Sequence, residues 1–67
     1  MKLSQLLARY DHDQLVEVRN DDGIIYKGLC QDTPPSIAMH KHVLSFHAVA
    51  AGKSASAMIP YIVVRVD

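Results

Sequence analysis

The segment from Leu15 to Cys30 constrains the fold most, because it holds two β-rich runs around one turn. Residues 16–19, Val-Glu-Val-Arg, alternate apolar and charged side chains, which is the two-residue period of a strand with one buried face. The second run, from Ile24 to Cys30, is rich in β-branched and aromatic residues. Between them, Asn20-Asp21-Asp22-Gly23 consists of residue types that tolerate a tight bend. The sequence therefore predicts an antiparallel hairpin.

A short helix is expected before the hairpin. Its apolar residues have the i, i+3, i+4, i+7 spacing of a helix with one buried stripe: Leu3, Leu6, Leu7 and Tyr10. Ser4 is the expected N-cap, and the pattern ends at Asp11-His12-Asp13. A helix of about two turns is not stable alone in water, so we expect its leucines to pack on the sheet.

Two prolines, Pro34 and Pro35, interrupt regular structure after the hairpin. Thr33 is a candidate cap for a short helical turn that runs from these prolines through residues 37–39. Residues 43–49 are expected to form a third strand. In that strand one face would carry Leu44, Phe46 and Ala48, and the other Ser45 and His47.

The last part of the chain predicts a loop and a fourth strand. Residues 50–57 are small and polar without periodicity, and we expect residues 51–54 to form an exposed loop. From Ile59 to Val66, Pro60 fits only near a strand start or on an edge, and residues 62, 64 and 66 form an apolar core face. The predicted fold class is α+β: a short N-terminal helix followed by a small antiparallel four-stranded sheet, with closure into a barrel left open.

Length and composition predict one small domain over residues 1–67. A domain of this size buries only ~60% of the surface that its unfolded chain exposes, so its stability is marginal and an identical neighbour would help it. Cys30 is the only cysteine, which excludes an intrachain disulfide and favours a reducing compartment. No signal peptide and no run of about 18 apolar residues is recognised, so a cytoplasmic protein is expected.

Charge argues against bulk attraction to nucleic acid, because seven basic and seven acidic residues cancel. The acids are concentrated between Asp11 and Asp32, whereas residues 33–66 contain none. A weakly basic interaction surface is therefore a hypothesis for the second half, formed by His40, Lys41, His42, Lys53 and Arg65. The alternative is that folding mixes the charges of the two halves.

No motif for catalysis, cofactors or metals is convincing. Gly52-Lys53-Ser54 matches only the tail of a phosphate-binding loop, because His47 stands where its first glycine belongs. His40 and His42 would point to the same side of an extended segment and suit zinc, but two further ligands at fitting spacing are missing. Cys30 falls inside an expected strand, where a small buried apolar role is typical. We expect no enzyme, no cofactor and no bound metal.

Several stretches resemble a group of small uncharacterised proteins encoded by phages and prophages of Gram-positive bacteria. These stretches are residues 1–7, 16–19, 22–28, 32–34, 43–46 and 62–66, which read MKLSQLL, VEVR, DGIIYKG, DTP, VLSF and IVVRV. The resemblance covers most of the chain and concerns a fold, not an active site. It implies a phage-type accessory protein in the cytoplasm of the bacterial host. Pro35 and the long segment 50–57 depart from the pattern.

A weaker resemblance is to Sm-like RNA-binding barrels, which also begin with a short helix, a strand, a glycine turn and a strand like residues 26–29. This resemblance implies ring-shaped oligomers that bind RNA. Their later Asp-x-x-Asn element is absent, because Asp32 is followed by Thr33 and prolines. The sequence therefore predicts a non-catalytic module that binds another protein or itself through exposed strand edges, with RNA binding as the alternative.

Overall fold

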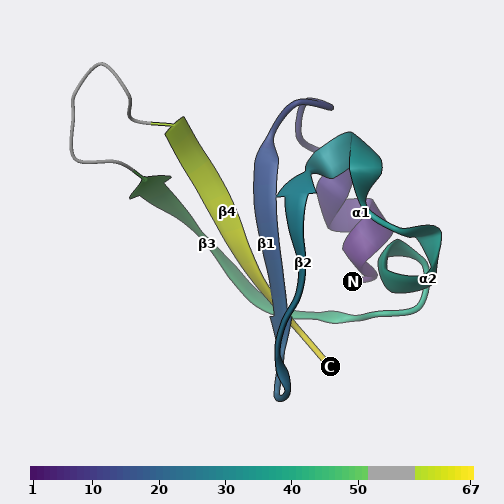
Figure 1. Cartoon of the computed structure of the whole chain (residues 1–67). Helices are drawn as coiled ribbons and strands as arrows, with labels where there is room; N and C mark the ends of the chain where they lie inside the picture. The colour runs from purple at the N-terminus through teal and green to yellow at the C-terminus, as the bar shows by residue number, and fades with distance from the viewer. Residues whose placement is uncertain (52–58) are drawn as a thin grey trace.

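The computed structural model describes residues 1–51 and 59–67, which form two short α-helices, a 3-10 helix and four strands (Figure 1). In chain order these elements are α1 (Leu3–Leu7), β1 (Leu15–Asn20), β2 (Gly23–Leu29), η1 (Cys30–Asp32), α2 (Pro35–Ala38), β3 (Val43–Ala51) and β4 (Ile59–Val66). The α+β class and the N-terminal helix are confirmed.

The sheet has the strand order β2-β1-β4-β3 and is mixed, so the prediction of a purely antiparallel sheet was wrong. The pairs β1/β2 and β3/β4 are antiparallel, as the local sequence predicts. The central pair β1/β4 is parallel, with Val16 opposite Ile62 and Val18 opposite Val64. The sheet does not close into a barrel, since β2 and β3 lie at opposite ends of the strand order. Two local hairpins are thus joined through their apolar inner strands.

One face of this sheet carries the core, on the side of α1 and α2 (Figure 1). The expected helix stripe and the expected inner face of the last strand are both confirmed: the buried residues are Leu3, Leu6, Leu7, Val16, Val18, Ile62, Val64 and Val66. Each such side chain contributes about 1.5–3 kcal/mol when fully removed from water. Eight of them suit a domain of marginal stability.

The start of α1 differs from the prediction, because Lys2 and not Ser4 is the N-cap residue. The Gln5 side-chain oxygen Oε1 accepts the backbone N–H of Lys2 at 2.8 Å. The helix ends at Leu7, and the half-buried Tyr10 packs against the core from beyond its end. The N-terminal segment is also tied to the chain before β3, since the Leu3 N–H donates to the Lys41 carbonyl oxygen at 2.9 Å.

The predicted hairpin is confirmed, with Asn20 paired to Gly23 across a two-residue loop. Gly23 has φ of 119°, a backbone conformation that other residues adopt only with strain. Oδ1 of Asn20 accepts the Asp22 N–H at 2.9 Å, the side-chain contact typical of Asx turns. The ladder shifts register between Val18 and Arg19, which indicates a bulge on the β2 side.

Predictions for the middle of the chain need two corrections. Cys30 begins η1 and does not lie in a strand. The helical turn after the prolines exists as α2, but Thr33 does not cap it, because its hydroxyl donates to the Cys30 carbonyl oxygen at 2.9 Å. The N-cap of α2 is Pro34.

The third strand is confirmed and continues to Ala51, so Ala51 belongs to β3 and not to the expected loop. The register agrees with the predicted alternation, because Phe46 and Ala48 pair with the buried Val64 and Ile62. Leu44, Phe46 and Ala48 are nevertheless exposed. Among the described residues, the short helices cover the inner part of the sheet, and in β3 it is Val43 that packs against the core. The rest of the predicted loop, residues 52–54, lies outside the described residues. Pro60 stands near the start of β4, as expected, before the first residue paired with β1.

Gly28 provides a test of the packing at the helix-covered face. A Cβ atom at this position would lie 2.8 Å from the hydroxyl oxygen of Tyr26. That hydroxyl donates to the Leu29 carbonyl oxygen at 2.5 Å, and burial raises the pKa of Tyr26, so it stays a neutral donor. We expect Gly28→Ala to lower the free energy of unfolding by about 1 kcal/mol, because it displaces this hydrogen bond.

If the close contact between the added Cβ atom and the Tyr26 hydroxyl causes this loss of stability, the loss should shrink when the hydroxyl is removed. In a Tyr26→Phe background, Gly28→Ala should therefore cost clearly less than in the wild type. Urea denaturation of both single variants and the double variant measures this coupling. Strictly additive losses would contradict the proposed contact.

Candidate functional site on the open face of the sheet

The sheet face opposite the helices carries a mostly polar cluster that spans all four strands. Cross-strand pairing places Lys27, Glu17, Val63 and His47 in one row, and Arg19, Arg65 and Ser45 in the next. These seven residues, which we call the open face, point away from the core because they alternate with the buried valines and isoleucine. The strand register that buries the valines and the isoleucine on one face therefore brings these seven residues together on the other face.

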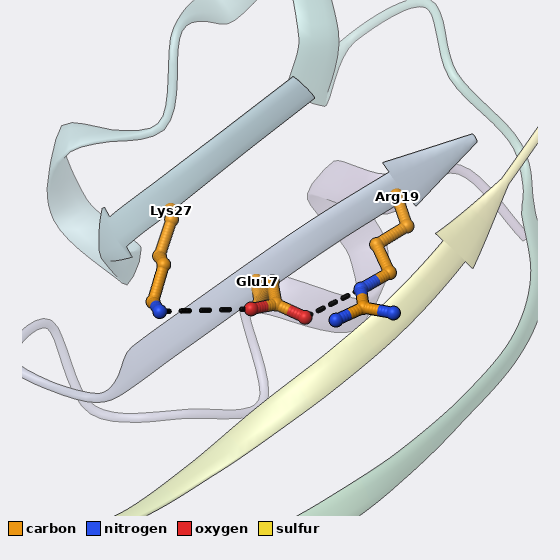
Figure 2. Close-up of polar contacts among 3 residues, drawn as sticks. All are labelled: Glu17, Arg19 and Lys27. Atoms are coloured by element: carbon orange, nitrogen blue, oxygen red, sulfur yellow. Dashed lines mark hydrogen bonds and ion pairs between the residues drawn. The ribbon is translucent and has the colours of Figure 1, made fainter. Parts of the chain in front are cut away.

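Glu17 is the most unusual of these residues, because it is a carboxylate with only 3% exposure. Its Oε2 accepts a hydrogen bond from Nε of Arg19 at 2.5 Å, and Nζ of Lys27 lies 3.8 Å from Oε1 (Figure 2). Figure 2 shows both cations reaching toward the carboxylate along the face of the sheet. The cations stay hydrated, with side chains 49% and 70% exposed for Arg19 and Lys27. Two cations, one on each side, thus balance the negative charge of Glu17.

Two arginines stand side by side in the second row, since Arg19 of β1 pairs with Arg65 of β4. Nη2 of Arg65 lies 2.6 Å from Oδ1 of Asp21 in the β1–β2 turn. Each guanidinium therefore has its own carboxylate, Glu17 for Arg19 and Asp21 for Arg65. Like charges on neighbouring strands repel, so these carboxylates are needed to hold the pair together.

Two hollows lie on this side of the sheet. One, of about 180 Å³, is lined by Arg19, Ser45, His47, Val63 and Arg65. The other is mainly apolar, about 260 Å³, and is lined by Leu15, Val16, Lys27, Gly28 and Tyr61. Both are smaller than the ~300 Å³ or more that drug-sized ligands occupy.

The predicted basic surface is only partly assembled. Arg65 lies on the open face, but His40 falls in a turn after α2 and Lys41 follows it. His42 forms a bridge with Lys2, and its ring Nδ1 lies 3.5 Å from Oδ2 of Asp67. Lys53 lies outside the described residues. Asp67 and Asp21 lie beside two of these groups, so the alternative that folding mixes the charges fits better.

Asp67 shows the effect of this pairing on a carboxyl group. The backbone N–H of His42 donates to its Oδ1 at 2.8 Å, and this hydrogen bond lowers the pKa of Asp67 below its ordinary value. The nearby charges of His42 and Lys41 act in the same direction. These residues therefore help to fix the end of β4 to the segment before β3.

The candidate metal ligands His40 and His42 and the candidate nucleophile Cys30 lie in different parts of the fold. His40 and His42 do not share an extended strand, and no group of three or more metal-ligand side chains occurs among the described residues. The thiol of Cys30 donates to the Leu7 carbonyl oxygen at 3.4 Å, and burial raises its pKa. A raised pKa leaves less thiolate at neutral pH, which disfavours a nucleophilic role.

Sequence reasoning missed Glu17, Arg19 and Lys27 as a cluster. The signal was present, because Glu17 and Arg19 are two residues apart on one strand and so share a face. The hairpin register then places Lys27 directly opposite Glu17. What the pattern does not indicate is that the carboxylate becomes buried on the outer face.

No family model, curated protein or solved structure matches this chain. The resemblances to phage-encoded proteins and to Sm-like proteins therefore stay predictions. In the part of the chain that the structure describes, no helix is long and apolar enough to span a membrane.

Proposed function

We propose that this protein is a small non-catalytic interaction module that binds a second copy of itself through the outer edge of β3, the last strand in the order of the described sheet. The observation that carries the proposal is the character of that edge. In the nine-residue strand, residues 43–51 include no lysine, arginine, aspartate, glutamate or proline. Long uncharged edges present unpaired backbone groups that readily accept another strand.

Exposure on β3 supports the same proposal. Leu44 is 63% exposed and Phe46 is 46% exposed, although both are large and apolar. Ala48 continues the exposed apolar residues two positions further along the strand. A strand added beside β3 would cover these side chains in addition to pairing the backbone, which adds hydrophobic stabilisation to the hydrogen bonds.

The other edge of the sheet has features that discourage pairing. β2 carries the exposed Lys27 in its middle, whereas β3 contains no lysine or arginine. Both edge strands have a register shift in their ladders, so the charge is what separates the two edges. Charges on edge strands are a common protection against unwanted association. The contrast between the two edges within one small sheet favours β3 as the interaction surface.

A second copy is the partner that fits this edge best. An antiparallel pair of two identical β3 strands places no lysine, arginine, aspartate or glutamate side chains opposite each other, because the strand has none. Twofold pairing of this kind is the commonest oligomer symmetry. A domain with eight buried apolar side chains among its described residues would also gain stability from a continuous eight-stranded sheet.

The non-catalytic part of the proposal rests on the candidate groups described above. Cys30 has a raised thiol pKa, and both hollows are small. The resemblance to phage and prophage proteins suggests the setting: an accessory protein in the cytoplasm of a bacterial host.

RNA binding of the Sm-like kind is less well supported. That alternative depended on a barrel and a basic surface, whereas the sheet is open and His42 and Arg65 each lie beside an aspartate. Neutral overall charge provides no bulk attraction for phosphates.

Sedimentation velocity over a range of protein concentrations tests the proposal. We expect the sedimentation coefficient to rise from that of one chain toward that of two as concentration increases, because edge pairing of this size gives a reversible dimer. The mass of a single chain at every concentration, up to the millimolar range, would contradict self-association.

A further inference from the structure

The hollow between Arg19 and Arg65 carries an inference that is independent of β3 pairing. We propose that this hollow binds a phosphate group, either inorganic phosphate or the terminal phosphate of a small monoester. The site is formed by side chains of three strands, Arg19 from β1, Arg65 from β4, and Ser45 and His47 from β3.

The donors suit a tetrahedral dianion. An arginine side chain has five N–H donors in a planar fork. Among the described contacts, Arg19 uses Nε toward Glu17, and Arg65 uses Nη2 toward Asp21. Both arginines therefore keep further N–H donors, and they line one hollow together with Ser45 and His47. Arginine pairs bind phosphate through several charge-assisted hydrogen bonds at once.

Charge explains why phosphate is favoured over a carboxylate. Each guanidinium already has one singly charged carboxylate, so a second carboxylate adds little. A dianion placed between the two arginines interacts with both and relieves the repulsion between neighbouring strands. Lys27 on the same face adds a third cation to this side of the sheet, against Glu17 and Asp21.

Size limits the ligand. The hollow has a volume of about 180 Å³. One phosphate group with part of its hydration fits this space, whereas a larger ligand would extend over the surface. Glu17 acts here as a positioning residue, because its buried carboxylate accepts the hydrogen bond from Nε of Arg19 and so fixes that end of the guanidinium.

Amide chemical shifts measured by NMR during titration with inorganic phosphate, at constant ionic strength and pH, test this site. We expect saturable shifts at residues of the hollow, and weakening of at least about tenfold in Arg19→Gln and in Arg65→Gln, because each loses charged hydrogen bonds. Arg9→Gln, which removes an exposed cation after α1, is the matched control and should leave the affinity unchanged within about twofold.

The ligand series distinguishes the source of the phosphate. Saturation by glycerol 3-phosphate with similar affinity indicates a site for monoesters, and saturation by inorganic phosphate alone indicates a site for the free anion. Both results support the proposal. Equal response to acetate or chloride, absence of saturation in the wild type, or unchanged affinity in folded Arg65→Gln would each overturn it. None of these results bears on the oligomeric state, so this proposal and that of β3 pairing fail separately.

Discussion

Ala48→Lys is expected to abolish self-association at concentrations where the wild type is dimeric. Ala48 is exposed and pairs with Ile62 near the middle of β3, so the substitution leaves the buried core unchanged. In a twofold pair of β3 strands, this substitution places two lysine ammonium groups close to the line along which the two strands meet. Juxtaposed like charges cost several kcal/mol, and we expect about 3 kcal/mol, or about a hundredfold loss in dimer affinity.

The matched control for this prediction is Gln31→Lys. It adds the same charge at an exposed position of η1, away from the β3 edge. Sedimentation velocity of the two variants and the wild type should show a monomer only for Ala48→Lys. Equal association of all three proteins would contradict the β3 edge as the interface.

Removal of both cations around Glu17 is expected to have the largest effect on stability. The double variant Arg19→Met, Lys27→Met leaves a carboxylate with 3% exposure and no charged partner among the described contacts. Breaking a buried pair from one side typically costs 3–5 kcal/mol, and we expect a loss of about 3 kcal/mol. This is a large part of the stability of a 67-residue domain.

Glu17 is buried whereas Arg19 and Lys27 are exposed, and this difference predicts which further substitution restores stability. Adding Glu17→Leu to the double variant removes the buried charge, and it should restore most of the lost free energy of unfolding. Glu17→Gln alone should cost about 1 kcal/mol, because the exposed arginine and lysine return to water. Urea denaturation of the three variants measures these differences. A loss below about 1 kcal/mol in the double variant, without recovery in the triple variant, would sink this account of the open face.

Periodicity predicted the parts of the fold that depend on local sequence. The leucine stripe of α1, the hairpin around Gly23 and the inner face of β4 all follow from spacings within one segment. The parallel pairing of β1 with β4 did not follow, because an alternating strand has the same pattern in a parallel and an antiparallel neighbourhood. Which strands become neighbours is decided by packing between distant segments.

The exposure of β3 was also beyond local prediction. Leu44, Phe46 and Ala48 alternate as a core face would, yet a helix of five residues cannot cover four strands. Of the candidate site, the sequence predicted Arg65 and missed Arg19 and Glu17. Finding them requires the register of β1 against β4, which determines that the two arginines are adjacent.

The central claim, that two β3 strands pair, is tested most directly by isotope-filtered NOE measurements on a mixture of labelled and unlabelled protein. We predict intermolecular NOEs between backbone protons of residues 44–48 in different copies, and none between copies of β2. Absence of intermolecular NOEs at millimolar concentration, or NOEs that connect β2 strands instead, would contradict it.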